Sequence, residues 1–224
     1  MNRIALITTA AMLAVPTTGF AADLTIGTPG AADAATDWSG FYAGVHGGMG
    51  TGEISMTDTF TSTTATASGW LAGLQAGYNF EAGNFVLGVE GDVSWADIGV
   101  EFDSGASGTH YRVDWMASLR GRAGVTLDSA LLYGTAGIET AGASVSIWNA
   151  SPGITDDVGA THSGWVAGLG AELMVTENVS LRGEYLYHAL GDEPYTITAP
   201  DLTQATADLG YAFRTLTVGA NFHF

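Results

Sequence analysis

The sequence predicts an all-β protein, an eight-stranded antiparallel up-and-down transmembrane β-barrel. Three observations lead to this prediction: eight runs that alternate apolar and polar residues, connectors that are short and long in turn, and a last run that continues to the terminal Phe224. Side chains at every second position of a strand share one face, so each run has an apolar and a polar face. A closed ring of such strands has no unpaired edge, which a bilayer requires.

The composition narrows the class of protein. A chain of 224 residues suits one barrel domain, and 32 glycines with 10% aromatic and 13% charged residues are not typical of a soluble α/β enzyme. Without cysteine, the chain has neither disulfides nor a thiolate metal site. The net charge is −17 and all six Lys and Arg residues are arginines, so nucleic acid is not expected as a partner, because nothing would neutralise a row of phosphates.

The N-terminal part reads as a targeting segment followed by a lead-in. Arg3 precedes an apolar core at residues 4–15, which is too short to span a bilayer as a helix. Small residues then mark a cleavage site, which predicts a signal peptide at residues 1–21. Residues 22–37 are small, polar and acidic and are expected to form a flexible periplasmic lead-in. The barrel is predicted to occupy residues 38–224.

The runs and their connectors set the topology. The connectors after the second, fourth and sixth runs are short, at residues 81–83, 128–129 and 176–178. Those after the first, third, fifth and seventh runs are longer and rich in Thr, Ser, Gly, Asp and Ala. Short turns at one end and long loops at the other are typical of outer-membrane barrels. The predicted strands are, in order, 38–49, 68–80, 84–97, 110–127, 130–142, 162–175, 179–190 and 209–224.

The apolar face of each run is predicted to contact lipid. In the first run Phe41, Ala43 and Val45 face outward, while Tyr42 and His46 face inward. The fifth run is rich in glycine, and its parity stays open. In the remaining runs the outward residues occupy alternate positions from Trp70 to Phe80, from Phe85 to Trp95, from Val113 to Leu127, from Trp165 to Val175, from Leu181 to Ala189 and from Leu216 to Phe224.

The opposite faces carry charged residues. A soluble ligand-binding barrel would show the reverse, an apolar interior and a polar outside. The predicted inward charges are Glu90 and Asp92 in the third run, Arg112, Asp114, Arg120 and Arg122 in the fourth, Glu172 in the sixth, and Arg182 and Glu184 in the seventh.

The outward aromatic residues fall into two groups, one near each end of the runs. Amphipathic rings favour the two membrane–water interfaces, so these groups predict two aromatic girdles rather than ordinary core filling. The girdle at the long-loop end contains Trp70, Trp95, Trp115, Trp165 and Tyr187, and the girdle at the short-turn end contains Phe41, Tyr78, Phe80, Phe85, Phe222 and Phe224.

Three segments carry a family resemblance: Trp38-Ser-Gly-Phe-Tyr-Ala-Gly-Val-His-Gly-Gly48, Gly69-Trp-Leu-Ala-Gly-Leu-Gln-Ala-Gly-Tyr-Asn-Phe80 and Leu119-Arg-Gly-Arg-Ala-Gly-Val125. With the aromatic C-terminal strand, they resemble the small Gram-negative outer-membrane β-barrel proteins of the OmpA-like and opacity-protein superfamily. More narrowly, the chain is similar to the major outer-membrane family that includes surface antigens and haemin-binding members. The resemblance implies a location in the cell outer membrane and insertion by the barrel-assembly machinery, with Phe224 as the assembly signal. No peptidoglycan-binding domain follows the barrel, so anchoring to the cell wall is not expected.

The inward charges form the candidate site. An unpaired charge in a narrow, partly dry lumen is costly, so each arginine needs carboxylate partners. One interpretation is a salt-bridged plug, and the alternative is a selectivity ring in a narrow porin. The plug is favoured because an eight-stranded barrel is just wide enough for side chains to fill. The predicted network contains Glu90, Asp92, Arg120, Arg122, Glu172, Arg182 and Glu184.

The histidines offer a different candidate function. None of the five has metal-ligand spacing, so no metal site and no resident cofactor are expected. Haemin capture by His110 or His162 beside Tyr111 is the ligand-binding alternative, weighed against isolated polar residues at strand ends. Catalysis is not expected, because His162 and Ser163 are adjacent on a strand and point to opposite faces.

The leading functional prediction is a monomeric, surface-exposed structural barrel that supports envelope integrity. A narrow porin and a haemin- or ligand-binding surface protein are the alternatives. The predicted partners are outer-membrane lipids, lipopolysaccharide and the barrel-assembly machinery. Acidic loop residues would hold divalent cations that bridge to lipopolysaccharide, and Arg214, whose parity faces lipid near the outer interface, would meet a phosphate directly.

Overall fold

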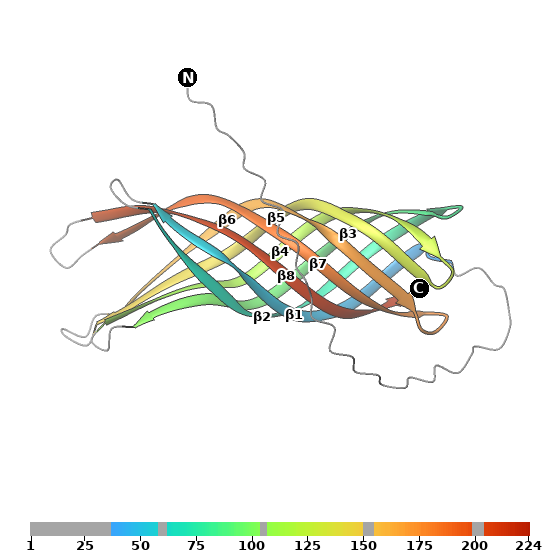
Figure 1. Ribbon diagram of the computed structural model, residues 1–224, viewed down its shortest axis with the longest axis horizontal. Coiled ribbons are helices and arrows are strands. Elements are labelled where there is room, and N and C mark those ends of the chain that lie inside the picture. Colours follow the sequence, from blue (N-terminus) through green and yellow to red (C-terminus); the bar gives the residue numbers. More distant parts are fainter. Residues whose placement is uncertain (1–36, 58–61, 104–106, 150–154, 199–203) are drawn as a thin grey trace, which may run out of the picture. The chain divides into compact units, whose positions relative to one another are not determined.

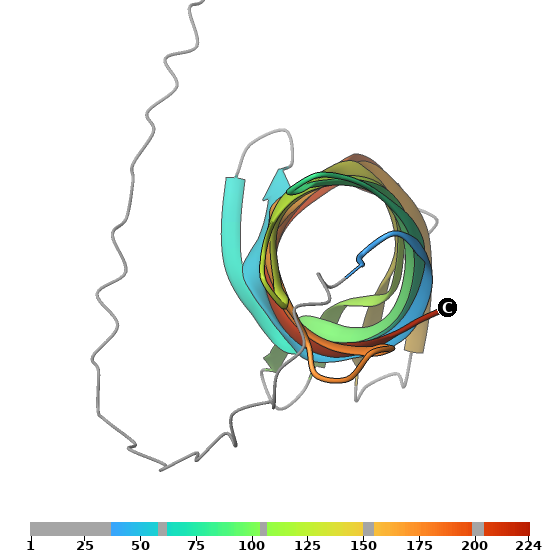
Figure 2. The ribbon, with the colours of Figure 1, turned by 90° about the vertical axis from the view of Figure 1, so that its right-hand side faces the viewer.

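Eight antiparallel strands, β1 to β8, close into one ring because β8 pairs with β1. Figure 1 shows the strands side by side along the barrel, and Figure 2 shows the closed ring from the end where the C-terminus lies. The computed structural model describes residues 37–57, 62–103, 107–149, 155–198 and 204–224. The predicted signal peptide and nearly all of the predicted lead-in lie outside these residues. The predicted eight-stranded up-and-down fold is confirmed.

The strands run further than predicted toward the long-loop end. Each contains 18 to 21 residues, whereas ~9–11 residues suffice to cross a membrane. Segments assigned to loops by composition pair instead with their neighbours, since Thr and other β-branched residues fit a pleated surface. The long connectors are therefore shorter than predicted. The strand bounds are β1 Gly40–Thr57, β2 Ser62–Ala82, β3 Phe85–Asp103, β4 Ser107–Leu127, β5 Ala130–Asn149, β6 Thr155–Met174, β7 Val179–Thr198 and β8 Gln204–His223.

The short-turn end is held together by local geometry and by the chain terminus. Gly83, between β2 and β3, has a φ of 63°, a left-handed conformation that glycine adopts without a Cβ penalty. The backbone N–H of Phe224 donates to the carbonyl oxygen of Phe41 at 3.0 Å, which joins the last residue to β1. The side-chain amide of Asn178 donates to the carbonyl oxygen of His223 at 3.0 Å.

No helix among the described residues is long and apolar enough to cross a membrane.

The outer face of the barrel is an apolar band. Leu169, Val218 and Ile138 expose 68 to 70% of their surface, an arrangement that water would penalise and lipid would not. Glycine-rich β5, whose parity the sequence leaves open, turns Leu132 and Ile138 outward and Leu131 inward. The outside is therefore apolar and much of the inside polar, the reverse of a soluble barrel.

The predicted inward or outward direction of the side chains at residues 112–114 of β4 is wrong. A β-bulge lies between Val113 and Trp115, where β4 carries one more residue than β5. The extra residue shifts the alternation by one position, so that every side chain above it changes face. Val113, predicted to face lipid, is 1% exposed inside the barrel. Arg112 and Asp114, predicted to face the lumen, keep 41% and 34% of their side chains exposed.

The interior is built in layers along the barrel axis. Along β3 the inward residues include Val86, then Glu90 and Asp92, then Ser94, and then Ala96 and Ile98, so apolar residues lie on each side of the polar stretch. The apolar floor at the short-turn end consists of Trp38, Val86, Leu131 and Tyr133, with Met174 packed against them. The apolar cap toward the long loops consists of Ala67, Leu71, Ala96, Ile98, Val113, Met116, Ala141, Ala143, Val145, Leu190 and Phe213.

Candidate functional site

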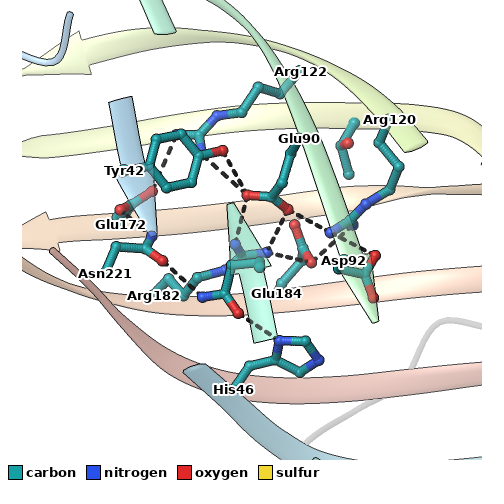
Figure 3. A network of polar contacts seen from close by, with 12 residues as sticks. Tyr42, His46, Glu90, Asp92, Arg120, Arg122, Glu172, Arg182, Glu184 and Asn221 are labelled. Atoms are coloured by element: carbon teal, nitrogen blue, oxygen red, sulfur yellow. Dashed lines mark hydrogen bonds and ion pairs between the residues drawn. The ribbon is translucent and has the colours of Figure 1, made fainter. Parts of the chain in front are cut away.

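The seven predicted lumen charges lie together in one layer, called here the charged layer (Figure 3). Four strands supply them: β3, β4, β6 and β7. Strand register places opposite charges side by side, since Glu90 pairs with Arg120 across β3 and β4, and Glu172 pairs with Arg182 across β6 and β7. Directly opposed charges of unlike sign stabilise a strand pair. The layer contains Glu90, Asp92, Arg120, Arg122, Glu172, Arg182 and Glu184.

Glu90 is the centre of the charged layer. Its carboxylate accepts a hydrogen bond from Arg120 Nη2 at 2.5 Å and two from Arg182, at 2.8 and 3.3 Å. The hydroxyl of Tyr42 donates to the same carboxylate at 2.6 Å, and Arg122 Nη1 lies 3.6 Å away. Glu90 is only 3% exposed, so protein donors replace nearly all of its water.

Glu184 binds two of the arginines that also bind Glu90, namely Arg120 and Arg182. It accepts from Arg120 Nη1 at 2.9 Å and from the hydroxyl of Tyr133 at 3.0 Å. Arg182 Nη2 lies 2.6 Å from its carboxylate. Two arginines are thus each shared between Glu90 and Glu184, which makes the layer a network rather than a set of isolated pairs.

Glu172 anchors the layer toward β8. It accepts hydrogen bonds from Arg122 at 3.1 Å, from the hydroxyl of Ser180 at 2.5 Å and from the side-chain amide of Asn221 at 2.6 Å. Arg122 also stacks against Tyr133, with its guanidinium carbon 4.4 Å from the ring centroid. A cation so placed gains from the ring's negative face.

Asp92 lies at the edge of the charged layer that faces the long-loop end. Its carboxylate accepts hydrogen bonds from the hydroxyls of Ser118 and Ser94, and Arg120 Nη2 lies 3.6 Å away. Its side chain is 12% exposed, more than the other carboxylates of the layer. Next to it is a cavity of about 20 Å³, enough for roughly one water molecule. The layer is therefore packed rather than open.

Sequence reasoning missed a hydrogen-bonded histidine–glutamate pair on the long-loop side of the charged layer. His188 Nδ1 lies 2.6 Å from Glu139, and its Nε2 lies 2.9 Å from the hydroxyl of Thr215. Glu139 belongs to the glycine-rich β5, whose alternation is weak. The charge of Glu139 was the available signal for its inward direction, because a glutamate side chain that faces lipid costs more free energy than one that faces the lumen. Tyr42 and Tyr133 were also missed as donors to the layer.

The two histidines considered for haemin differ in accessibility. His162 is fully buried, with Nδ1 3.0 Å from the carbonyl oxygen of Gly191. His110 is half-buried on β4, next to Tyr111. His162 is therefore a poor ligand for an external group in this conformation. Among the residues that the structure describes, no cluster of three or more His, Asp or Glu side chains could hold a metal ion.

The structure places the predicted girdle residues on the outer wall. Trp165 and Tyr187 contact each other, with ring centroids 5.5 Å apart. Phe222 and Phe224 pack edge to face at 5.2 Å at the closing seam of the barrel. The recognition of Phe224 during assembly stays a prediction. The exposed fractions are 53% for Trp70, 56% for Trp95, 38% for Trp115, 52% for Trp165, 66% for Phe41, 61% for Phe80, 65% for Phe85, 48% for Phe222 and 77% for Phe224.

Comparison with known proteins gives a consistent result. The family model described as "Outer membrane protein beta-barrel domain" matches residues 11–224. The 31 kDa outer-membrane immunogenic protein of Brucella melitensis is 32% identical over the full length of both chains. The 22 kDa outer membrane protein of Rhizobium leguminosarum is 33% identical over 85% of this chain and 80% of its own. The solved structure of the outer-membrane protease OmpT from Escherichia coli aligns with a TM-score of 0.54 at 10% identity, over 82% of this chain and 96% of that chain, a likeness of fold alone.

Proposed function

Since the chain belongs to the outer-membrane β-barrel protein family and lies in the outer membrane, we propose that it is a sealed structural barrel that supports the envelope. One observation supports the proposal: buried ion pairs meet in the charged layer, and a buried apolar cluster lies on each side of it. The barrel then acts as a rigid element of the membrane rather than as a route across it.

The layers explain why such a barrel would not conduct. An ion that enters from the long-loop end meets the apolar cap, where it would lose water without gaining polar partners. Further in, it would have to separate arginines and carboxylates that are each less than 5% exposed, such as Arg120 and Glu184. Both steps are unfavourable, and they act in series.

The long-loop end of the barrel supports a role as a surface antigen. The strands that lead to the connectors after β1, β3, β5 and β7 continue well beyond the girdle containing Trp70 and Trp165, so the strand ends lie above the lipid-facing band. Several relatives are named outer-membrane immunogenic proteins. We infer that these connectors present the protein outside the cell, as a monomer surrounded by lipid. Catalysis is not part of the proposal, because His162 is buried while Ser163 is exposed on the opposite face.

Planar-bilayer recording of the refolded protein tests the plug. We expect no steady channel, because the charged layer and the apolar cap both block the lumen. Folding of the barrel is verified separately by heat-modifiable migration in detergent gels, and a known porin serves as the positive control for conductance. A reproducible open state of fixed conductance would contradict the plug and favour the narrow porin.

Haemin binding is the alternative that a titration decides. His110 is the accessible histidine of the pair, and it adjoins Tyr111. If a surface site exists, haemin should give a shifted Soret band that His110→Ala abolishes and His162→Ala retains. A shift that survives both substitutions would point to unspecific adsorption on the apolar band.

A further inference from the structure

Arg214 is an arginine on the lipid side of β8, and its height is set by strand register. Leu216 and Val218, the next outward residues toward the short-turn end, are 64% and 70% exposed and belong to the apolar band. Arg214 pairs across the sheet with Thr51 on one side and with Tyr187, a girdle residue, on the other. Its side chain is therefore the first polar group above the band on this strand.

Other strands of the barrel, β2, β3 and β6, place polar residues at the corresponding position. Going outward along each strand, Ser68 follows Trp70, Asp97 follows Trp95 and Ser163 follows Trp165, and all three are exposed. Together with Thr51 and Arg214 they mark the line where the outer wall changes from apolar to polar. Because the long-loop end of such barrels faces the cell exterior, this line lies at the headgroups of the outer leaflet.

The charge of Arg214 has no carboxylate partner among the side chains that the structure describes. Three of the described arginines, Arg120, Arg122 and Arg182, are buried in the charged layer. Arg112 is outward, but its guanidinium lies 2.6 Å from Asp114 and 3.9 Å from Asp97. Among the described side chains, Arg214 makes no ion pair with a carboxylate within 4 Å. An exposed guanidinium that no described carboxylate neutralises, at a membrane interface, is suited to an anionic headgroup.

The surface beside Arg214 is hollowed. A pocket of about 250 Å³ lies over β1, β2, β7 and β8 and is lined by Thr51, Thr66, Tyr187, Ala212 and Arg214, among others. Three of these residues carry hydroxyl groups, which supplement an arginine in binding phosphate oxygens. The volume far exceeds that of a water molecule, ~30 Å³ of liquid, and accommodates a phosphate with part of a sugar ring.

We propose that Arg214 and this hollow bind a phosphate group of lipopolysaccharide, the phosphorylated glycolipid of the outer leaflet. The guanidinium takes the phosphate oxygens in bidentate fashion, while the acyl chains lie along Leu216 and Val218 below it. The protein has a net charge of −17 and as a whole repels anionic lipids, so binding requires a local cation of this kind. The site lies outside the lumen, so the proposal does not depend on whether the charged layer closes the barrel.

Native mass spectrometry of the refolded barrel with lipid A tests the proposal. The wild-type protein should hold bisphosphorylated lipid A, and Arg214→Gln should lower the affinity about 5- to 10-fold, the loss of one exposed charge-assisted contact. Arg112→Gln is the matched control, because it removes an outward arginine on β4, across the ring from β8, that is already paired, and it should bind as the wild type does. Lipid A without phosphates lacks the group that Arg214 would bind. It should therefore bind the wild-type protein and Arg214→Gln equally weakly.

Three outcomes would overturn the site. Equal binding by Arg214→Gln and the wild type would show that Arg214 takes no part. An equal loss in Arg112→Gln would indicate general electrostatics instead of a local site. Displacement of lipid A by inorganic phosphate at equal concentration would indicate a site for free anions. Heat-modifiable migration of each variant establishes that the barrel is folded in every arm.

Discussion

Replacing Glu90 with alanine is expected to destabilise the barrel by ~3–5 kcal/mol, because it leaves buried arginine charges without their shared acceptor. Arg120 and Arg182 donate to Glu90 at 2.5 to 3.3 Å, and the side chains of both are 2% exposed. The free energy of unfolding in urea, measured by heat-modifiable migration of the refolded protein, reports the loss. An effect below about 1 kcal/mol would mean that water reaches this layer, contrary to a packed plug.

Two further variants separate charge from packing. Asp92→Asn removes a carboxylate at the edge of the same layer, where Arg120 is 3.6 Å away and exposure is greater, so its cost should be clearly smaller. In Glu90→Leu with Arg182→Met, both partners of one contact become apolar, and part of the lost stability should return. If the double variant is as unstable as Glu90→Ala, the loss arises from shape rather than from unpaired charge.

Replacing Leu169 with arginine is the second substitution with a large expected effect. Leu169 is 69% exposed at the middle of the outward positions of β6. On the surface of a soluble protein such a change would be nearly neutral, whereas at the bilayer midplane it costs ~2–4 kcal/mol. Unfolding measured after refolding into lipid vesicles should show this cost.

Thr161→Arg is the matched control on the same strand. Thr161 is also exposed, but it lies above the girdle residue Trp165, where an arginine costs ~0–1 kcal/mol. The difference between the two variants measures depth in the membrane. Equal stability of both variants would contradict the assignment of this face to the hydrocarbon core.

Much of the fold could be predicted from the sequence, because alternation is a local property. Membrane strands must place apolar groups at every second residue, so Trp70 to Phe80 and Leu216 to Phe224 reveal both their strand character and their outward face. The charges on the opposite faces then had to meet in the lumen. All seven residues of the predicted network lie in one layer, although the register that brings them there joins strands far apart in the chain.

The errors have a common physical origin in effects that alternation does not encode. A single extra residue at the bulge before Trp115 reversed the faces of Arg112, Val113 and Asp114. The polar strand extensions carried no lipid-facing pattern, so they were assigned to loops. Glu139 was missed because glycines in β5 remove the pattern that would show its face.

The alternating residues of the chain by themselves determined the strand number, the up-and-down order, the lipid-facing band and the set of charges in the lumen. Only the tertiary structure decided that Glu90 binds Arg182, 92 residues away, and that an apolar floor and cap enclose the charged layer. It also decided that Arg112 pairs with Asp114, whereas Arg214 forms no ion pair with any described carboxylate. These choices depend on strand register, bulges and the closure of β8 on β1, which set the height of every inward and outward side chain and which no single strand contains.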